Sequence, residues 1–106
     1  MATAYRVVLV AVPTGGKAES MADSLVESRL AACVNVLPGV VSIYRWKGRV
    51  HRDAESLLVI KTTVARYPAL ERWIKAHHAY ETPEIISLPV AAGSKEYLSW
   101  LASSVK

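Results

Sequence analysis

The fold is decided by the run Leu57-Leu58-Val59-Ile60-Lys61-Thr62-Thr63, the centre of a strand expected over residues 56–64. Apolar and β-branched side chains follow one another here without alternation, which is typical of a strand covered on both faces. The first apolar run, Arg6 to Val12, has the same character and stops at Pro13-Thr14-Gly15-Gly16. These two runs predict the central strands of a β-sheet.

Helical periodicity follows the first strand and recurs twice later. Between Lys17 and Ala32 an apolar stripe repeats with the spacing of an amphipathic helix. Pro68 suits the first turn of a second helix, because its missing N–H would be unpaired there in any case. That helix must end before Pro83. Ser94 is a suitable N-cap for a third, C-terminal helix.

Two further strands complete the pattern. Residues 33–46 are extended, and Lys47-Gly48 predicts a hairpin turn that leads back towards residues 56–64. Pro38-Gly39, in the middle of the first hairpin arm, predicts a kink, a bulge or an edge position. Glu84 to Ala91 reads as the fourth strand, and Pro89 places it at an edge or makes that residue its end.

The order of these elements is strand, helix, strand, strand, helix, strand, helix. It predicts an α+β fold in one domain over 1–106: a ferredoxin-like βαββαβ (split βαβ) sandwich with an extra C-terminal helix. Right-handed crossovers would place both main helices on one face of an antiparallel sheet. The other face would then be bare although its strands are apolar, so we expect an oligomer to cover it.

Composition excludes several classes of function. The 106 residues are 52% hydrophobic and 21% charged, and no run approaches the length of a membrane span. The net charge is +4, but only Arg45 to Arg52 is densely basic, as expected of an exposed hairpin. The strand around Val59 lacks the aromatic residues with which such sheets stack RNA bases. A single cysteine, Cys33, favours a reducing, cytoplasmic compartment. The sequence contains no recognisable motif of a catalytic nucleophile, so we do not expect an enzyme.

The chemistry-bearing side chains gather at His77 to Ile85, between the second helix and the fourth strand. Imidazole and carboxylate groups are common ligands of divalent metals. Adjacent histidines diverge by about 100° on a regular helix, so they share a metal only at a distorted helix end or across subunits. The alternative is that one of them caps the helix C-terminus. Glu81 and Glu84 either complete a metal site or are surface carboxylates.

Several long motifs, in order, carry a resemblance to a known family. They are Ser24 to Asn35, Pro38 to Gly48, Ile60-Lys61-Thr62, His78 to Ile85 and Leu88-Pro89-Val90, ending at Tyr97-Leu98-Ser99-Trp100. Over nearly the whole chain these segments closely resemble the CutA divalent-cation tolerance proteins. The resemblance implies a tightly packed ferredoxin-like trimer, cytoplasmic in bacteria, that is associated with tolerance to copper and other divalent cations.

By this resemblance His77 and His78 match the histidines that bind copper in some members. Cu²⁺ is expected ahead of Zn²⁺ from the general affinity order of such sites. The chain departs from the pattern twice. Val10 stands where those members carry a cysteine ligand, and a valine side chain cannot coordinate a metal. Ala79 replaces a proline after the second histidine.

A trimer would also give the remaining polar residues a role. Lys61 lies in an otherwise apolar strand, where a charge needs a partner, and Glu84 or Glu81 is the expected one. Together with Tyr80 and Cys33 these residues would form an intersubunit cleft, which either binds a ligand or cements the interface. Cys33 is either a soft copper ligand or a small buried hydrophobe. The alternative functions are a small-molecule or signalling module with the architecture of the PII proteins, and a trimeric scaffold for partner proteins. No nucleic-acid or membrane partner is expected.

Overall fold

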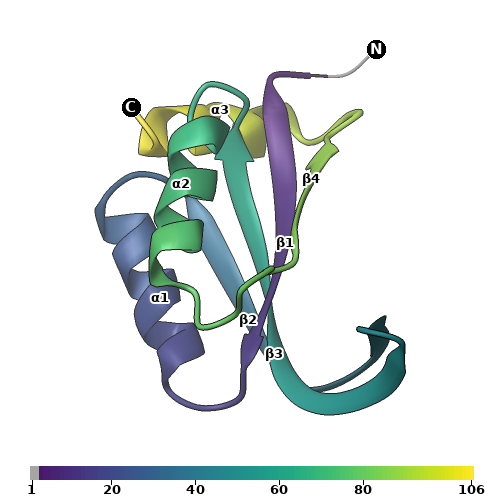
Figure 1. Ribbon diagram of the computed structural model, residues 1–106. Coiled ribbons are helices and arrows are strands. Elements are labelled where there is room, and N and C mark those ends of the chain that lie inside the picture. Colours follow the sequence, from purple (N-terminus) through teal and green to yellow (C-terminus); the bar gives the residue numbers. More distant parts are fainter. Residues whose placement is uncertain (1–2) are drawn as a thin grey trace.

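The computed structural model describes residues 3–106 and contains four strands and three helices in the predicted order (Figure 1). The elements are β1 (Tyr5–Pro13), α1 (Lys17–Glu27), β2 (Cys33–Trp46), β3 (Arg49–Thr63), α2 (Tyr67–His77), β4 (Ile85–Pro89) and α3 (Lys95–Ser104). The sheet is antiparallel with the order β2-β3-β1-β4. This is the ferredoxin-like split βαβ topology, so the predicted fold is confirmed. Among the described residues no helix is long and apolar enough to cross a membrane.

The core lies between the sheet and the two helices that cover it. Figure 1 shows α1 and α2 side by side on one face of the sheet. Alternate residues of the two central strands point towards them and are fully buried, among them Val8 and Val10 on β1 and Leu58 and Ile60 on β3. They pack against helix residues such as Leu25 and Ile74. The inward-facing side chains of the two central strands and the apolar stripes of the helices therefore form one core.

The opposite face of the sheet is only partly covered. Helix α3 closes one end, where Leu101 and Val105 pack with Ala32 and Tyr5. The prediction that Ser94 caps this helix is confirmed, because the Tyr97 N–H donates to the Ser94 hydroxyl over 3.3 Å.

The rest of that face is apolar and open. Three large side chains on it are more than two-fifths exposed: Leu37 at 42%, Ile86 at 47% and Leu88 at 44%. They lie on the two edge strands, β2 and β4, so the apolar surface extends across the width of the sheet. The subunit thus leaves a substantial apolar face without a cover of its own.

The β2–β3 hairpin is longer than predicted. Its turn is at Lys47 and Gly48, as expected, and both have left-handed φ values of 52° and 77°, which suit a tight hairpin turn. We expected a separate strand from residue 56, and this was wrong: β3 runs without a break over Arg49–Thr63. Because β1 pairs only with residues 55–63, the segment 40–54 forms an arm that projects beyond the sheet (Figure 1). The predicted irregularity at Pro38-Gly39 is confirmed by a register shift between Leu37 and Val40.

Helix α1 ends at Glu27, and the prediction that it continues to Ala32 was wrong. The chain turns at Arg29, which has a left-handed φ of 61°. The Arg29 N–H donates to the Val26 carbonyl and the Leu30 N–H to the Leu25 carbonyl. This pair of hydrogen bonds forms a Schellman motif. Leu30 and Leu25 lie in the same apolar core, as the corresponding residues of this motif usually do. Glycine is common at this position of the motif. Because arginine stands there in this chain, the end of the helix was not predicted.

Replacing Arg29 with glycine is expected to raise the free energy of unfolding by up to about 1 kcal/mol, because a left-handed conformation costs L-residues about 1–2 kcal/mol and glycine almost nothing. The greater freedom of glycine in the unfolded chain offsets part of this gain. Denaturant unfolding of the two proteins at equal concentration measures the change. A matched Arg45→Gly change in the exposed hairpin should not stabilise the protein. A loss of stability in Arg29→Gly would contradict the account of this turn.

Candidate functional site

The predicted site is an elbow between α2 and β4, residues 77–84. Its first residue, His77, ends the helix with its ring stacked on Trp73 at 4.0 Å between centroids. The His77 Nδ1–H donates to the Trp73 carbonyl over 2.7 Å, which ties the ring back to its own helix one turn earlier. The bond leaves Nε2 with a free lone pair, and no hydrogen bond from the described residues occupies it. Metal-binding histidines usually have this arrangement, in which the second ring nitrogen donates to a backbone carbonyl.

His78 has a different role within the subunit. Its Nε2–H donates to the Ala11 carbonyl on β1 over 2.8 Å, and its Nδ1 accepts from the Tyr80 N–H over 3.0 Å. Both ring nitrogens are therefore in use, and the side chain fastens the elbow to the sheet. For His78 to bind a metal, its ring would have to release one of these partners.

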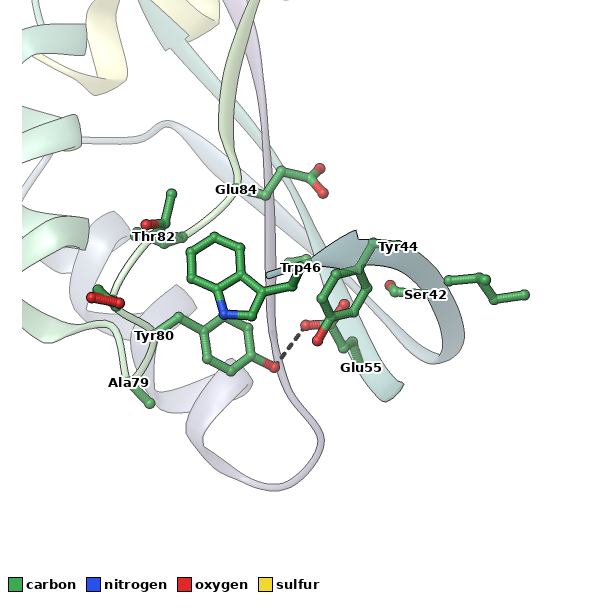
Figure 2. A pocket seen from close by; sticks show the side chains of 12 residues that line it. Ser42, Tyr44, Trp46, Glu55, Ala79, Tyr80, Thr82 and Glu84 are labelled. Carbon is green, nitrogen blue, oxygen red and sulfur yellow. Dashed lines mark hydrogen bonds between the residues drawn. The ribbon is translucent and has the colours of Figure 1, made fainter. Parts of the chain in front are cut away.

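Opposite the elbow stands the hairpin arm, and a cleft of about 750 Å³ separates the two. Figure 2 shows the facing side chains: Tyr80 from the elbow, and Trp46, Tyr44 and Glu55 from the hairpin. The Tyr80 hydroxyl donates to a carboxylate oxygen of Glu55 over 2.7 Å and so joins the elbow to β3. The lining consists of Ala11, Ser42, Ile43, Tyr44, Trp46, Glu55, Ala79, Tyr80, Glu81, Thr82, Pro83 and Glu84.

The two cleft tyrosines are held in their neutral form. Burial, and then the hydrogen bond to Glu55, raise the pKa of Tyr80 well above its ordinary value. The hydrogen bond to Asp53 is the main cause that raises the pKa of Tyr44. A folded-state pKa above the unfolded value of about 10 favours folding below that pH, and the contribution is lost as the pH rises through the folded-state value. Both phenols therefore act as hydrogen-bond donors at neutral pH.

The structure divides the predicted intersubunit cluster into two groups. Tyr80, Glu81 and Glu84 line the cleft. Lys61 and Cys33 instead face each other at the opposite end of the sheet, on its bare face. Within the subunit the Lys61 ammonium bonds with Asn35 rather than with Glu81 or Glu84. A contact between the two groups across subunits stays a prediction.

Cys33 and Val10 are placed as follows. Cys33 is half-buried, not fully buried; burial and then the neighbouring Cys33 raise the pKa of Tyr97 on α3. Val10 is fully buried on the helix-facing side of β1 and contributes to the apolar core. Within one subunit, the described residues contain no group of three or more His, Cys, Asp or Glu side chains arranged to hold a metal ion.

Sequence reasoning missed Tyr44, Trp46 and Glu55 on the hairpin side of the cleft, and Asp53, which bonds to Tyr44. Trp46 lies in the segment 45–52, which was interpreted as a solvated edge, and the other three residues were given no role. The signal was in the register. Side chains alternate between the two faces along each strand, so the pairing on either side of the turn at Lys47-Gly48 places all four residues on one face of the hairpin. The partner on the elbow, Tyr80, could not be found in this way because it depends on how α2 returns the chain to the sheet.

Together, the fold and the elbow define a small α+β protein of ferredoxin-like topology with a paired-histidine turn beside an acidic, aromatic cleft. Comparison with known families then identifies it further. The family model described as "CutA1 divalent ion tolerance protein" matches residues 6–104. The chain belongs to this family.

Similar proteins support the same assignment. The divalent-cation tolerance protein CutA of Thermus thermophilus is 54% identical over 95 residues, which are 90% of this chain and 92% of that protein. The CutA protein of Escherichia coli is 40% identical over 104 residues, 98% of this chain and 93% of that one. A chloroplastic CutA of Arabidopsis thaliana is 44% identical over 100 residues, 94% of this chain but only 55% of that protein.

Solved structures agree with the fold. The structure of the Thermus thermophilus protein superposes with a TM-score of 0.93 at 50% identity and covers 96% of this chain and 99% of that one. The structure of CutA1 from Oryza sativa gives a TM-score of 0.94 at 43% identity, covering 99% and 96%. The recognition of the CutA family from the sequence is thus confirmed.

Proposed function

We propose that this protein is a cytoplasmic homotrimer that binds divalent cations, Cu²⁺ in particular, and acts in metal tolerance without catalysing a reaction. The single observation that carries the proposal is membership of the divalent ion tolerance family over residues 6–104. The open apolar face of the sheet supports assembly, because an oligomer would bury it. The lone Cys33 thiol supports a reducing compartment.

The two histidines of the elbow have unequal roles in this proposal. His77 supplies the metal-binding nitrogen, Nε2, and its bond to the Trp73 carbonyl holds the ring in the required tautomer. His78 positions the elbow through Ala11 and Tyr80, and it would join as a second ligand only by exchanging one of those bonds. One imidazole per subunit makes a weak site, so water or a neighbouring subunit would supply the remaining ligands.

Titration calorimetry with Cu²⁺ tests the assignment. His77→Ala is expected to weaken binding at least about tenfold, equivalent to about 1.4 kcal/mol, because it removes the free imidazole nitrogen. The matched control is His51→Ala, since His51 lies on the hairpin arm and stacks on Tyr44. Equal affinities in wild type and His77→Ala would refute the assignment.

The stacking of His77 on Trp73 offers a second readout of the same prediction. Paramagnetic Cu²⁺ bound at His77 should quench the Trp73 fluorescence, whereas Zn²⁺ should compete without quenching. A Trp73→Phe protein should lose most of the Cu²⁺-dependent quenching although its other two tryptophans remain.

A further inference from the structure

The cleft between hairpin and elbow has an unusual charge. Within one chain, three carboxylates line it, those of Glu55, Glu81 and Glu84, and none of its lining residues is basic. The chain as a whole carries a formal charge of +4, so the acidity is local. A concave surface lined by one sign of charge concentrates ions of the opposite sign. The cleft is therefore suited to a cation.

Glu55 is almost completely buried, since only 4% of its surface is exposed. One of its carboxylate oxygens accepts the Tyr80 hydroxyl, and the described residues contain no salt bridge to the other. Every fully buried side-chain oxygen or nitrogen in the described chain has a hydrogen-bond partner. The second Glu55 oxygen has none among the described residues, so it is not fully buried, and it is accessible from the cleft that Glu55 lines. A carboxylate in such a place is stabilised by a bound positive charge.

The wall of the cleft indicates what kind of cation fits. Trp46 and Tyr44 from the hairpin and Tyr80 from the elbow present aromatic rings to the same space (Figure 2). Aromatic faces attract ammonium and guanidinium groups but do not ligate metal ions. The carboxylates are also not clustered as metal ligands, since no group of three potential ligands forms among residues 3–106. A volume of about 750 Å³ accommodates an organic molecule.

Hydrogen bonds hold both sides of this wall in place. Tyr44 bonds with Asp53 across the hairpin, and Tyr80 bonds with Glu55 between elbow and hairpin. The Tyr44 and Tyr80 rings and the buried carboxylate are thus positioned before any ligand arrives, which reduces the entropic cost of binding.

We propose that this cleft binds a small organic cation, an alkylammonium or diammonium ion, with its positive charge against Glu55 and its carbon atoms against Trp46 and Tyr80. Glu84 and Glu81, at the rim, would hold a second positive charge. This site is separate from the metal site proposed at His77, whose ring stacks on Trp73 of α2 and does not line the cleft.

Calorimetric titration of the full-length protein in its native assembly, at fixed ionic strength, tests the proposal. The probes are tetramethylammonium and 1,4-diaminobutane, with neutral tert-butyl alcohol as the uncharged counterpart of the first. Saturable binding of the ammonium ions and no binding of the alcohol is the expected result. The diammonium ion should bind more tightly than tetramethylammonium, and the Glu84→Gln change should remove that advantage.

Two further variants test whether the ammonium ions bind in this cleft. Trp46→Leu should weaken tetramethylammonium binding about tenfold, because it removes an aromatic face that attracts the cation. The control Trp100→Leu changes an equally exposed tryptophan on α3, outside the cleft, and should have no effect. His77→Ala should retain ammonium binding and Trp46→Leu should retain Cu²⁺ binding, so the failure of one proposal is distinguishable from failure of the other.

Three results would overturn the proposal. They are the absence of saturable binding by both ammonium ions, equal binding of the neutral alcohol, and equal affinity in Trp46→Leu and wild type. A crystal structure of the assembly with a lysine or arginine of a neighbouring copy filling the cleft would also overturn it, because the cation would then belong to the interface.

Discussion

Replacing Ile86 with glutamate is expected to break up the proposed trimer, so that the protein sediments as a species of 11.6 kDa, the mass of one chain. Ile86 is 47% exposed on the bare face of the sheet, opposite Leu9 in the register. In a trimer that buries this face, the new carboxylate would be desolvated without a partner, at a cost of about 3–5 kcal/mol for each copy. Because symmetry repeats the change in every subunit, the assembly should come apart at micromolar concentration.

The matched control is Val26→Glu. Val26 is 42% exposed but lies on α1, in the helix layer on the other side of the sheet. Sedimentation velocity should therefore give this variant the mass of the wild type, and circular dichroism should show that both variants keep their helices. A wild type that already sediments as one subunit would contradict the proposed trimer, as would an Ile86→Glu variant that keeps the wild-type mass.

The second large effect is expected in the core. Leu58 is fully buried in the central strand β3 and packs beneath the two helices. Truncation to alanine removes apolar contacts and leaves a cavity, which costs about 2–5 kcal/mol in comparable sites. Since domains of this size are stable by about 5–15 kcal/mol, Leu58→Ala should unfold at much lower denaturant concentration. Chemical denaturation at equal protein concentration is the measurement, because oligomer stability depends on concentration.

Val64→Ala is the control for this substitution. Val64 directly follows β3 and is 46% exposed, so its truncation should change the free energy of unfolding by no more than about 0.5 kcal/mol. If the two variants were destabilised equally, Leu58 would not have the central position in the core that the structure assigns to it.

Much of the fold could be predicted because strand and helix periods are local properties. The buried faces of β1 and β3, the turn at Lys47-Gly48 and the cap at Ser94 all depend on residues close together in the chain. The errors arose where a usual marker was absent or misleading. Arg29 ends α1 without the glycine that normally marks such an end, and the strand expected over residues 56–64 left out residues 49–55, through which β3 runs without a break. Polar residues are tolerated there because the hairpin arm projects beyond the sheet.

The candidate site was harder to predict because it depends on contacts between distant segments. The bond of the His77 ring to the Trp73 carbonyl is local, since the two residues lie one helical turn apart. The bond of His78 to Ala11 joins residues 67 positions apart, and that of Tyr80 to Glu55 joins residues 25 apart. No local pattern encodes such a pair. The cleft therefore became visible only when the hairpin and the elbow were placed together.

The kink at Pro38-Gly39 has a consequence for the behaviour of the chain in solution. β2 is an edge strand of 14 residues, long enough to template the addition of a strand from another molecule and so to start a fibril. Pro38 offers no N–H to such a strand, and the irregular pairing after Leu37 breaks the continuity of the ladder. This edge of β2 is thereby divided into shorter pieces, which disfavours the addition of a strand from another molecule.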